Sequence, residues 1–330
     1  MKKILIIPAR KHSIEAYTEY LIRYLGSEFY FEMGYPPEPP YDDFKHRIWT
    51  GATSPLEKNP DEFDLIWPHF DSHWFLVPPE KYAHKVVNVQ FEPGGTRFPT
   101  VAACTSEPVH NSFKHSHCLR FGVDTRLFAP YPMVRTDNKF HIGFVGNIQT
   151  PRRYLKELFI PLENIPNARL AVYPAVWHKH TRPDEIEAMG GWSVINSIVD
   201  GDKWWPGFPN CYNRMDVFVR CDIDSGYQLS ILEAAACGVP VVTTDKGVGK
   251  EICNSGGGIY VECKEGNWEP EVLKELAGRI REAVTKLRDD GKLREDMGRK
   301  GRKFVEENYT WEKWIPKWRE FFREGLKNAG

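Results

Sequence analysis

The sequence predicts an α/β protein made of two successive halves, each with a parallel β-sheet flanked by helices. Short apolar runs rich in β-branched residues alternate with segments of helical periodicity, which is typical of repeated β–α units. The chain has 330 residues, enough for two domains, and its 41% hydrophobic content lets each half bury a core. We therefore expect two Rossmann-like β/α/β domains.

The first series of elements occupies the N-terminal part of the chain. Four apolar runs are predicted to be strands, at residues 4–7, 64–67, 86–91 and 100–104. After the first of them, Ile14, Tyr17, Leu21 and Leu25 share one face of a helix. Prolines and charges between residues 35 and 60 predict an irregular surface segment there.

A second series begins near residue 140, with strands expected at 140–145, 168–173, 216–220 and 239–243. The proline-rich stretch 128–132 separates the two series and has the composition of a linker. We therefore place an N-terminal domain at 1–131 and a C-terminal domain at 132–310. Aromatic and aliphatic side chains at helical spacing over 311–326 predict a closing helix whose aromatic face packs on the protein's own core.

Composition and charge argue against several classes of function. The formal net charge is -1, and the basic stretch 292–303 is interleaved with acids, so we expect a solvated helix face and no nucleic-acid binding. No run approaches the about 18 apolar residues of a membrane span, and the run 4–7 is too short for a signal peptide. The seven cysteines form no C-x-x-C pair. We expect a cytoplasmic protein; peripheral membrane contact through 311–326 is the alternative that the glutamates of this helix disfavour.

The stretch from Asp222 to Asp245 contains the most informative pattern. A strand leads through a glycine-containing turn into a helix predicted at 229–237, which ends at Gly238. Backbone N–H groups of Tyr227, Gln228 and Leu229 would open this helix, where unpaired amides and the helix dipole favour an anion. Glu233, one turn further on, could accept hydrogen bonds from the vicinal hydroxyls of a ribose. The pattern predicts a nucleotide-sugar site.

Residues 226–242 resemble the donor-binding motif of retaining GT-B glycosyltransferases of family 4, which belong to the glycosyl transferases group 1. Residues 121–130, 144–147 and 308–311 resemble three further segments of that family in order and spacing. The resemblance implies a GT-B fold, in which two Rossmann-like domains face a central cleft. It also implies that helix 311–330 crosses back to complete the N-terminal domain.

The resemblance implies an activity as well. Proteins of this family transfer a sugar from a nucleotide-sugar, here UDP- or GDP-linked, to an acceptor with retention of configuration and without a metal ion. The acceptor would be a glycan, a lipid or a small molecule. We therefore expect neither a metal nor a cofactor, because the nucleotide-sugar is a substrate.

Individual site residues follow from the same resemblance. His69, at the end of a predicted strand, aligns with the family's active-site histidine, and Arg152 and Arg153 are the nearest cations for the diphosphate. Together with Glu233 they are the candidate catalytic residues. The implied donor-binding residues are Asn147, Asp224, Ser225, Gly226, Tyr227, Gln228, Leu229 and Glu233. The candidate acceptor-binding residues are Glu92, Gly94 and Gly95.

Of three departures from the family pattern, those at Ser225 and Asn147 leave a second interpretation open. Ser225 stands in place of the family's first glutamate, Asn147 in place of an arginine, and Gln228 in place of a glycine. A catalytically degenerate protein would bind a nucleotide-sugar or glycan without transferring it. An epimerase or hydrolase of nucleotide-sugars with the GT-B fold is a third interpretation.

Two other chemistries are disfavoured. Asp222 and Asp224 could chelate Mn²⁺ or Mg²⁺ beneath a diphosphate, but two carboxylates alone are a weak signal for a metal site. No G-x-G-x-x-G follows a predicted strand, which argues against a dehydrogenase.

Overall fold

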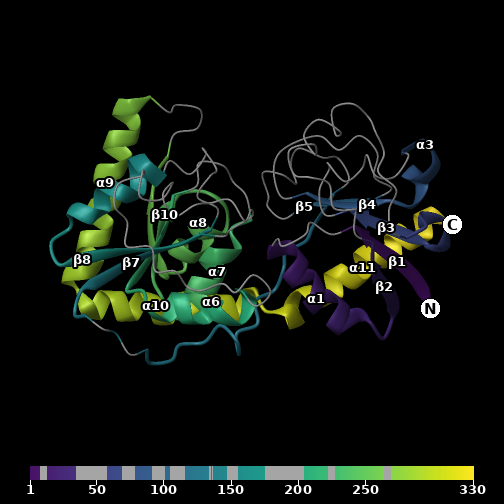
Figure 1. Ribbon diagram of the computed structural model, residues 1–330, viewed down its shortest axis with the longest axis horizontal. Helices are drawn as coiled ribbons and strands as arrows, with labels where there is room; N and C mark the ends of the chain where they lie inside the picture. The colour runs from purple at the N-terminus through teal and green to yellow at the C-terminus, as the bar shows by residue number, and fades with distance from the viewer. Residues whose placement is uncertain are drawn as a thin grey trace. The chain divides into compact units, whose positions relative to one another are not determined.

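The computed structural model in Figure 1 divides into two compact units, Met1–Gly122 with Glu312–Gly330, and Val123–Trp311. It describes residues 1–7, 13–34, 58–68, 79–90, 101–104, 116–133, 135, 137–146, 155–174, 204–221, 227–263 and 269–330. The domain limits expected from the sequence, after residues 131 and 310, stay a prediction. Each unit is described by itself.

The first unit contains two groups of parallel strands, in the orders β2-β1-β3 and β4-β5-β6. Their bounds are β1 Lys2–Ile7, β2 Phe29–Met33, β3 Leu65–Pro68, β4 Val87–Gln90, β5 Val101–Cys104 and β6 Ser116–Cys118. A parallel bridge between Ile66 and Val86 connects the groups. The apolar run that predicted β1 is explained by its burial, since strands of a parallel sheet are covered on both faces.

The helices of the first unit include α1 (Ser13–Leu25) and α11 (Trp311–Ala329). Shorter helical segments are η1 Pro60–Glu62, α3 Pro79–Tyr82 and η3 Ala83–Lys85. Trp318 of α11 packs its ring against Trp67 of β3 and Phe121, at centroid distances of 5.3 and 5.1 Å. The aromatic face predicted for this helix is therefore buried in the protein's own core. Among the described residues, no helix combines the length and the apolar character that crossing a membrane requires.

The second unit is built on one five-stranded parallel sheet in the order β11-β10-β9-β7-β8. The strands are β7 Phe140–Gly146, β8 Ala168–Pro174, β9 Val217–Arg220, β10 Val241–Thr244 and β11 Gly258–Val261. The chain leaves β7 for β8 on one side and then returns to β9 on the other, so the strand order reverses between β7 and β9. In open α/β sheets ligands bind outside the carboxyl ends of the strands at such a reversal.

Helices cover both faces of this sheet (Figure 1). The helical segments are η5 Leu155–Phe159, η6 Ile160–Asn164, α6 Trp204–Asn213, α7 Leu229–Ala236, α8 Gly247–Asn254, α9 Pro270–Asp289 and α10 Gly291–Asn308. Val217 and Val219 of β9 pack in the core cluster that contains α9, whereas Phe218 packs in the cluster that contains α6, α7 and α8. Alternate side chains of one strand thus enter two cores, as a doubly covered sheet requires.

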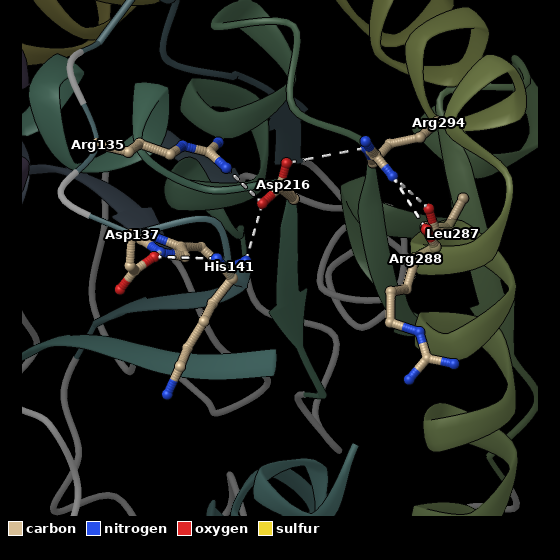
Figure 2. A network of polar contacts seen from close by, with 8 residues as sticks. Arg135, Asp137, His141, Asp216, Leu287, Arg288 and Arg294 are labelled. Atoms are coloured by element: carbon tan, nitrogen blue, oxygen red, sulfur yellow. Dashed lines mark hydrogen bonds and ion pairs between the residues drawn. The ribbon is translucent and has the colours of Figure 1, made fainter. Parts of the chain in front are cut away.

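A polar network ties together the amino ends of β7 and β9 (Figure 2). Asp216, directly before β9, accepts hydrogen bonds from the backbone N–H of His141 at 2.8 Å and from Arg135 Nη1 at 2.6 Å. Arg294 Nε of α10 lies 3.9 Å from the same carboxylate. The network therefore holds the strands from the edge opposite to their carboxyl ends.

Asp137 forms a second part of this network. Its carboxylate is 2.7 Å from His141 Nε2 and accepts a hydrogen bond from Arg169 Nη1 of β8 at 2.9 Å. The hydrogen bond with His141 and then that with Arg169 hold the pKa of Asp137 far below its usual range.

Candidate functional site

The carboxyl ends of β7 and β9 mark the candidate site of the second unit. Asn147 is the first residue after β7, and Arg152 and Arg153 follow shortly after it. Asp224, Ser225 and Gly226 lie in the segment between β9 and α7. All six predicted residues fall outside the described residues, but the strands from which their segments begin meet at the reversal of strand order.

Helix α7 begins at this edge and confirms the helix predicted at 229–237. It ends at Ala236 with Cys237 as its C-cap, and Gly238 follows with φ of 74°, the left-handed conformation expected of a C′ glycine. Gly238 N donates to Ala235 O at 2.9 Å, so the end of the helix is closed by backbone hydrogen bonds. Ala234, Ala235 and Ala236 are fully buried, which lets α7 pack closely on its neighbours.

The start of α7 is linked to the start of α8 by Gln228. This residue is 1% exposed, and its side chain makes no capping hydrogen bond to α7 itself. Its Oε1 instead accepts a hydrogen bond from Gly249 N in the first turn of α8 at 3.3 Å. Lys246, the N-cap of α8, makes no side-chain capping bond. The positive ends of two helix dipoles are therefore held side by side at the carboxyl edge of the sheet.

Two described cations adjoin these helix starts. Arg220, the last residue of β9, donates from Nη1 to Ser230 Oγ in the first turn of α7 at 2.5 Å. Lys246 Nζ lies 3.9 Å from the carboxylate of Asp245 at the start of α8. Cations near the N-terminus of a helix are disfavoured by its dipole, so a bound anion would offset their repulsion. Arg220 was missed from the sequence, although a cation that ends an apolar strand at the ligand edge was a usable signal.

Glu233 lies one turn into α7 and is 4% exposed. Its Oε2 accepts a hydrogen bond at 2.5 Å from the hydroxyl of Tyr212, a residue of α6 that is fully buried. Tyr212 was not a sequence-based candidate, because it precedes its partner by 21 positions in another helix. Tyr227 and Leu229, the other described candidates, are both half-buried at the start of the helix. The structure thus places Leu229 and Glu233 on α7, and Tyr227 and Gln228 directly before it.

The candidates of the first unit follow the ends of its strands. His69 is the residue directly after β3, and Glu92, Gly94 and Gly95 come shortly after β4. All four lie outside the described residues. β1 and β3 flank the reversal in the strand order of this unit, so the segment that contains His69 leaves the sheet where a ligand is expected.

A metal site has no support in the described part of the chain. Within those residues, no group of three or more His, Cys, Asp or Glu side chains could hold a metal ion. Asp222 and Asp224, the pair considered from the sequence, fall outside them.

Comparison with known proteins adds a family to this geometry. Residues 139–282, which carry the elements from β7 to β11 and most of α9, match the family model described as glycosyl transferases group 1. A curated relative is the GtfA subunit of the UDP-N-acetylglucosamine–peptide N-acetylglucosaminyltransferase of Streptococcus parasanguinis. It is 23% identical over 119 residues, which are 36% of this chain and 22% of the relative. The matched region therefore spans only about a fifth of that relative.

Solved structures resemble the chain over nearly its whole length. HepE of Anabaena, in complex with UDP and glucose, has a TM-score of 0.65 and 13% identity, with 98% of this chain and 99% of that chain covered. Sucrose-phosphate synthase of Thermosynechococcus elongatus has a TM-score of 0.70 and 13% identity, with both chains fully covered. A glycosyltransferase of Rickettsia africae has a TM-score of 0.66 and 14% identity, with 99% of each chain covered.

These likenesses concern the fold, and they confirm the predicted class. The strands of both units are parallel, and the chain superposes on glycosyltransferase structures with TM-scores of 0.65 and 0.70. The chain has the GT-B fold, and its residues 139–282 match the family model of glycosyl transferases group 1.

Proposed function

We propose that this protein is a glycosyltransferase that moves a sugar from a UDP- or GDP-linked donor to an acceptor, with retention of configuration and without a metal ion. The observation that carries the proposal is the placement of the α7 start and of Glu233 at the reversal of strand order, within the domain that matches glycosyl transferases group 1. The acceptor would be a glycan, a lipid or a small molecule.

In this proposal the diphosphate and the ribose of the donor contact different parts of α7. The diphosphate would lie at the start of the helix, near Tyr227 and Gln228, where the dipole favours negative charge. The amide of Leu229, expected to be unpaired, already donates to Tyr227 O at 3.2 Å. Arg220 would add a guanidinium at the start of the helix, since it already contacts Ser230 in the first turn. The hydroxyls of the ribose would donate to the carboxylate of Glu233.

The main role of the protein in this reaction is to hold positive groups in fixed positions around the leaving phosphate. When the bond between the sugar and the diphosphate breaks, negative charge grows on the leaving phosphate, and preorganised N–H groups and cations stabilise it there. Arg152 and Arg153 are proposed as further cations. The hydroxyl of the acceptor forms the new bond on the same face of the sugar and gives its proton to the leaving phosphate. His69 is proposed to contact the sugar, and Glu92, Gly94 and Gly95 to contact the acceptor.

Two findings direct the choice of donor and compartment. HepE was solved with UDP and glucose, and the curated relative is named for UDP-N-acetylglucosamine, so uridine is the first base to test. We also propose a cytoplasmic location, because six cysteines with described side chains form no disulfide, as is usual where thiols stay reduced.

The experiment that tests the function measures turnover and donor binding together. The full chain is incubated with UDP- and GDP-sugars, with and without a panel of acceptors, in the presence of EDTA. We expect release of nucleoside diphosphate that depends on an acceptor, and a product whose anomeric configuration, read by NMR, equals that of the donor. Glu233→Ala should weaken donor binding by about tenfold or more, because it removes a charged hydrogen-bond acceptor.

The competing functions give different results in the same experiment. Glu295→Ala, on an exposed position of α10, is the matched control and should leave donor binding unchanged. Binding without release would indicate the degenerate protein, and release without acceptor would indicate a hydrolase. Donor affinity that is equal in Glu233→Ala and the control would reject the assigned site.

A further inference from the structure

We propose that Tyr212 is a positioning residue of the donor site. Its buried hydroxyl holds the carboxylate of Glu233 in the orientation that receives the ribose hydroxyls, and so contributes to the preference for ribonucleotides over deoxyribonucleotides. This inference rests on the proposed function, in which Glu233 accepts hydrogen bonds from the ribose.

The contact joins two helices that are distant in sequence. Tyr212 lies near the end of α6, and its hydroxyl donates to Glu233 Oε2 of α7 at 2.5 Å. A carboxylate that is 4% exposed needs hydrogen bonds to compensate for the water it has lost. A phenol supplies such a bond without a positive charge, and a carboxylate can accept several bonds at once. The contact with Tyr212 is therefore compatible with one to a ribose.

The ring of Tyr212 is itself held by other aromatic side chains. It makes an edge-to-face contact with Phe218 of β9 at 5.7 Å and 70°, and another with Phe128 at 6.1 Å and 62°. These contacts restrict the two side-chain torsions of the tyrosine. The hydroxyl thus has a fixed position relative to β9, the strand that ends at the candidate site.

Glu233 has more torsional freedom than its partner, so the hydrogen bond restricts the orientation of the carboxylate. A glutamate side chain has three torsions and loses considerable rotamer freedom when it is fixed. Cys237, one turn along α7, does not compete for the carboxylate as an anion. Burial, followed by the charge of Glu233, raises the pKa of its thiol well above the usual value, so it stays neutral.

The test compares binding of ribonucleotides and deoxyribonucleotides to conservative variants. The affinities of UDP, 2′-deoxy-UDP, GDP and 2′-deoxy-GDP are measured by calorimetry for the full chain, for Tyr212→Phe and for Tyr173→Phe. Tyr173 is the matched control, because it lies in the same core cluster and its hydroxyl, which lies near Arg214, makes no hydrogen bond with Glu233. Phenylalanine keeps the ring of both tyrosines and therefore their packing.

We expect the unmodified protein and Tyr173→Phe to prefer the ribonucleotide by about tenfold or more, the size of a charged hydrogen bond. In Tyr212→Phe this preference should fall to about threefold or less, while 2′-deoxy-UDP or 2′-deoxy-GDP binds nearly as before. If Tyr212 had only a structural role, Tyr212→Phe would weaken the binding of ribonucleotides and deoxyribonucleotides equally, and the ratio of the two affinities would not change. An unchanged ratio in Tyr212→Phe overturns the inference.

A second pair of variants tests the coupling through Glu233. Glu233→Gln keeps the size of the side chain and should itself abolish the preference, so adding Tyr212→Phe should change the ratio no further. A further fall in the double variant overturns the inference. If the unmodified protein binds none of the nucleotides, or binds ribonucleotides and deoxyribonucleotides equally, the proposed function itself fails. This result is distinguishable from failure of the inference about Tyr212, which concerns only the variants.

Discussion

Gly298 allows α10 to approach the end of α7, and its replacement by alanine should destabilise the second unit. A Cβ atom at this position would lie 2.1 Å from the carbonyl oxygen of Gly238 and 3.1 Å from its carbonyl carbon. Ordinary contacts begin at 3.4 Å, so the two helices would have to separate by about 1.3 Å, the difference between 3.4 and 2.1 Å. The opposing oxygen belongs to the backbone and cannot rotate away.

The magnitude follows from a comparison with Gly278, which lies in α9 and has no atom within 4 Å of its Cβ position. Both glycines lie inside helices, so alanine brings each variant the same gain of about 1 kcal/mol in helix propensity. Overpacking costs about 1–3 kcal/mol, and contact with a rigid backbone atom places Gly298→Ala at the upper end. The free energy of unfolding of Gly278→Ala should therefore be about 3 kcal/mol higher than that of Gly298→Ala.

Urea unfolding followed by circular dichroism measures this difference. For an m-value of about 3 kcal/mol/M, the midpoints of the two variants should differ by about 1 M urea. Gly278→Ala should unfold at a higher concentration than the unmodified chain, and Gly298→Ala at a lower one. Equal midpoints for the two variants would refute the close approach of α10 to Gly238.

Three further predictions concern the network at the strand ends and the cation beside α7. Asp216→Ala should lower the free energy of unfolding by about 1–3 kcal/mol, because the N–H of His141 loses its acceptor, whereas the exposed Asp296→Ala should change it by less than about 1 kcal/mol in the same urea titration. The lowered pKa of Asp137 predicts a stabilisation that is complete above pH of about 4 and is lost as the pH falls towards the depressed pKa. The difference in urea midpoint between the unmodified chain and Asp137→Asn should therefore shrink from pH 5 to pH 3, and a constant difference would contradict it. Arg220→Met should weaken the binding of UDP by about tenfold and leave the binding of uridine nearly unchanged, as measured by calorimetry. Equal losses of affinity for both would place the guanidinium away from the diphosphate.

Much of the fold could be predicted because buried parallel strands have continuous apolar sequences. The run predicted at 140–145 is β7, Phe140–Gly146, and it is covered by helices on both faces. Strand β2 was missed because only its first residue, Phe29, is buried, so it has no buried apolar run. The three residues of β6 are too few for a pattern to be recognised. The division between α9 and α10 was also missed, although Asp290 caps α10 by accepting from Leu293 N at 2.9 Å.

The candidate site could be predicted where its residues are neighbours in sequence. Helix α7, with Tyr227 at its start and Glu233 one turn in, follows from local spacing alone. The contacts that orient it are long-range, and no local pattern encodes them. Tyr212 contacts Glu233 from another helix, and Gln228 accepts a hydrogen bond from the first turn of α8.

The proposed donor site is tested most directly by a crystal structure of the full chain with UDP or GDP, whichever binds, because it gives the position of the nucleotide. We expect the diphosphate to lie at the start of α7 and the ribose hydroxyls to donate to Glu233. A nucleotide bound away from the carboxyl ends of β7 and β9, or a ribose that does not contact Glu233, would contradict this expectation.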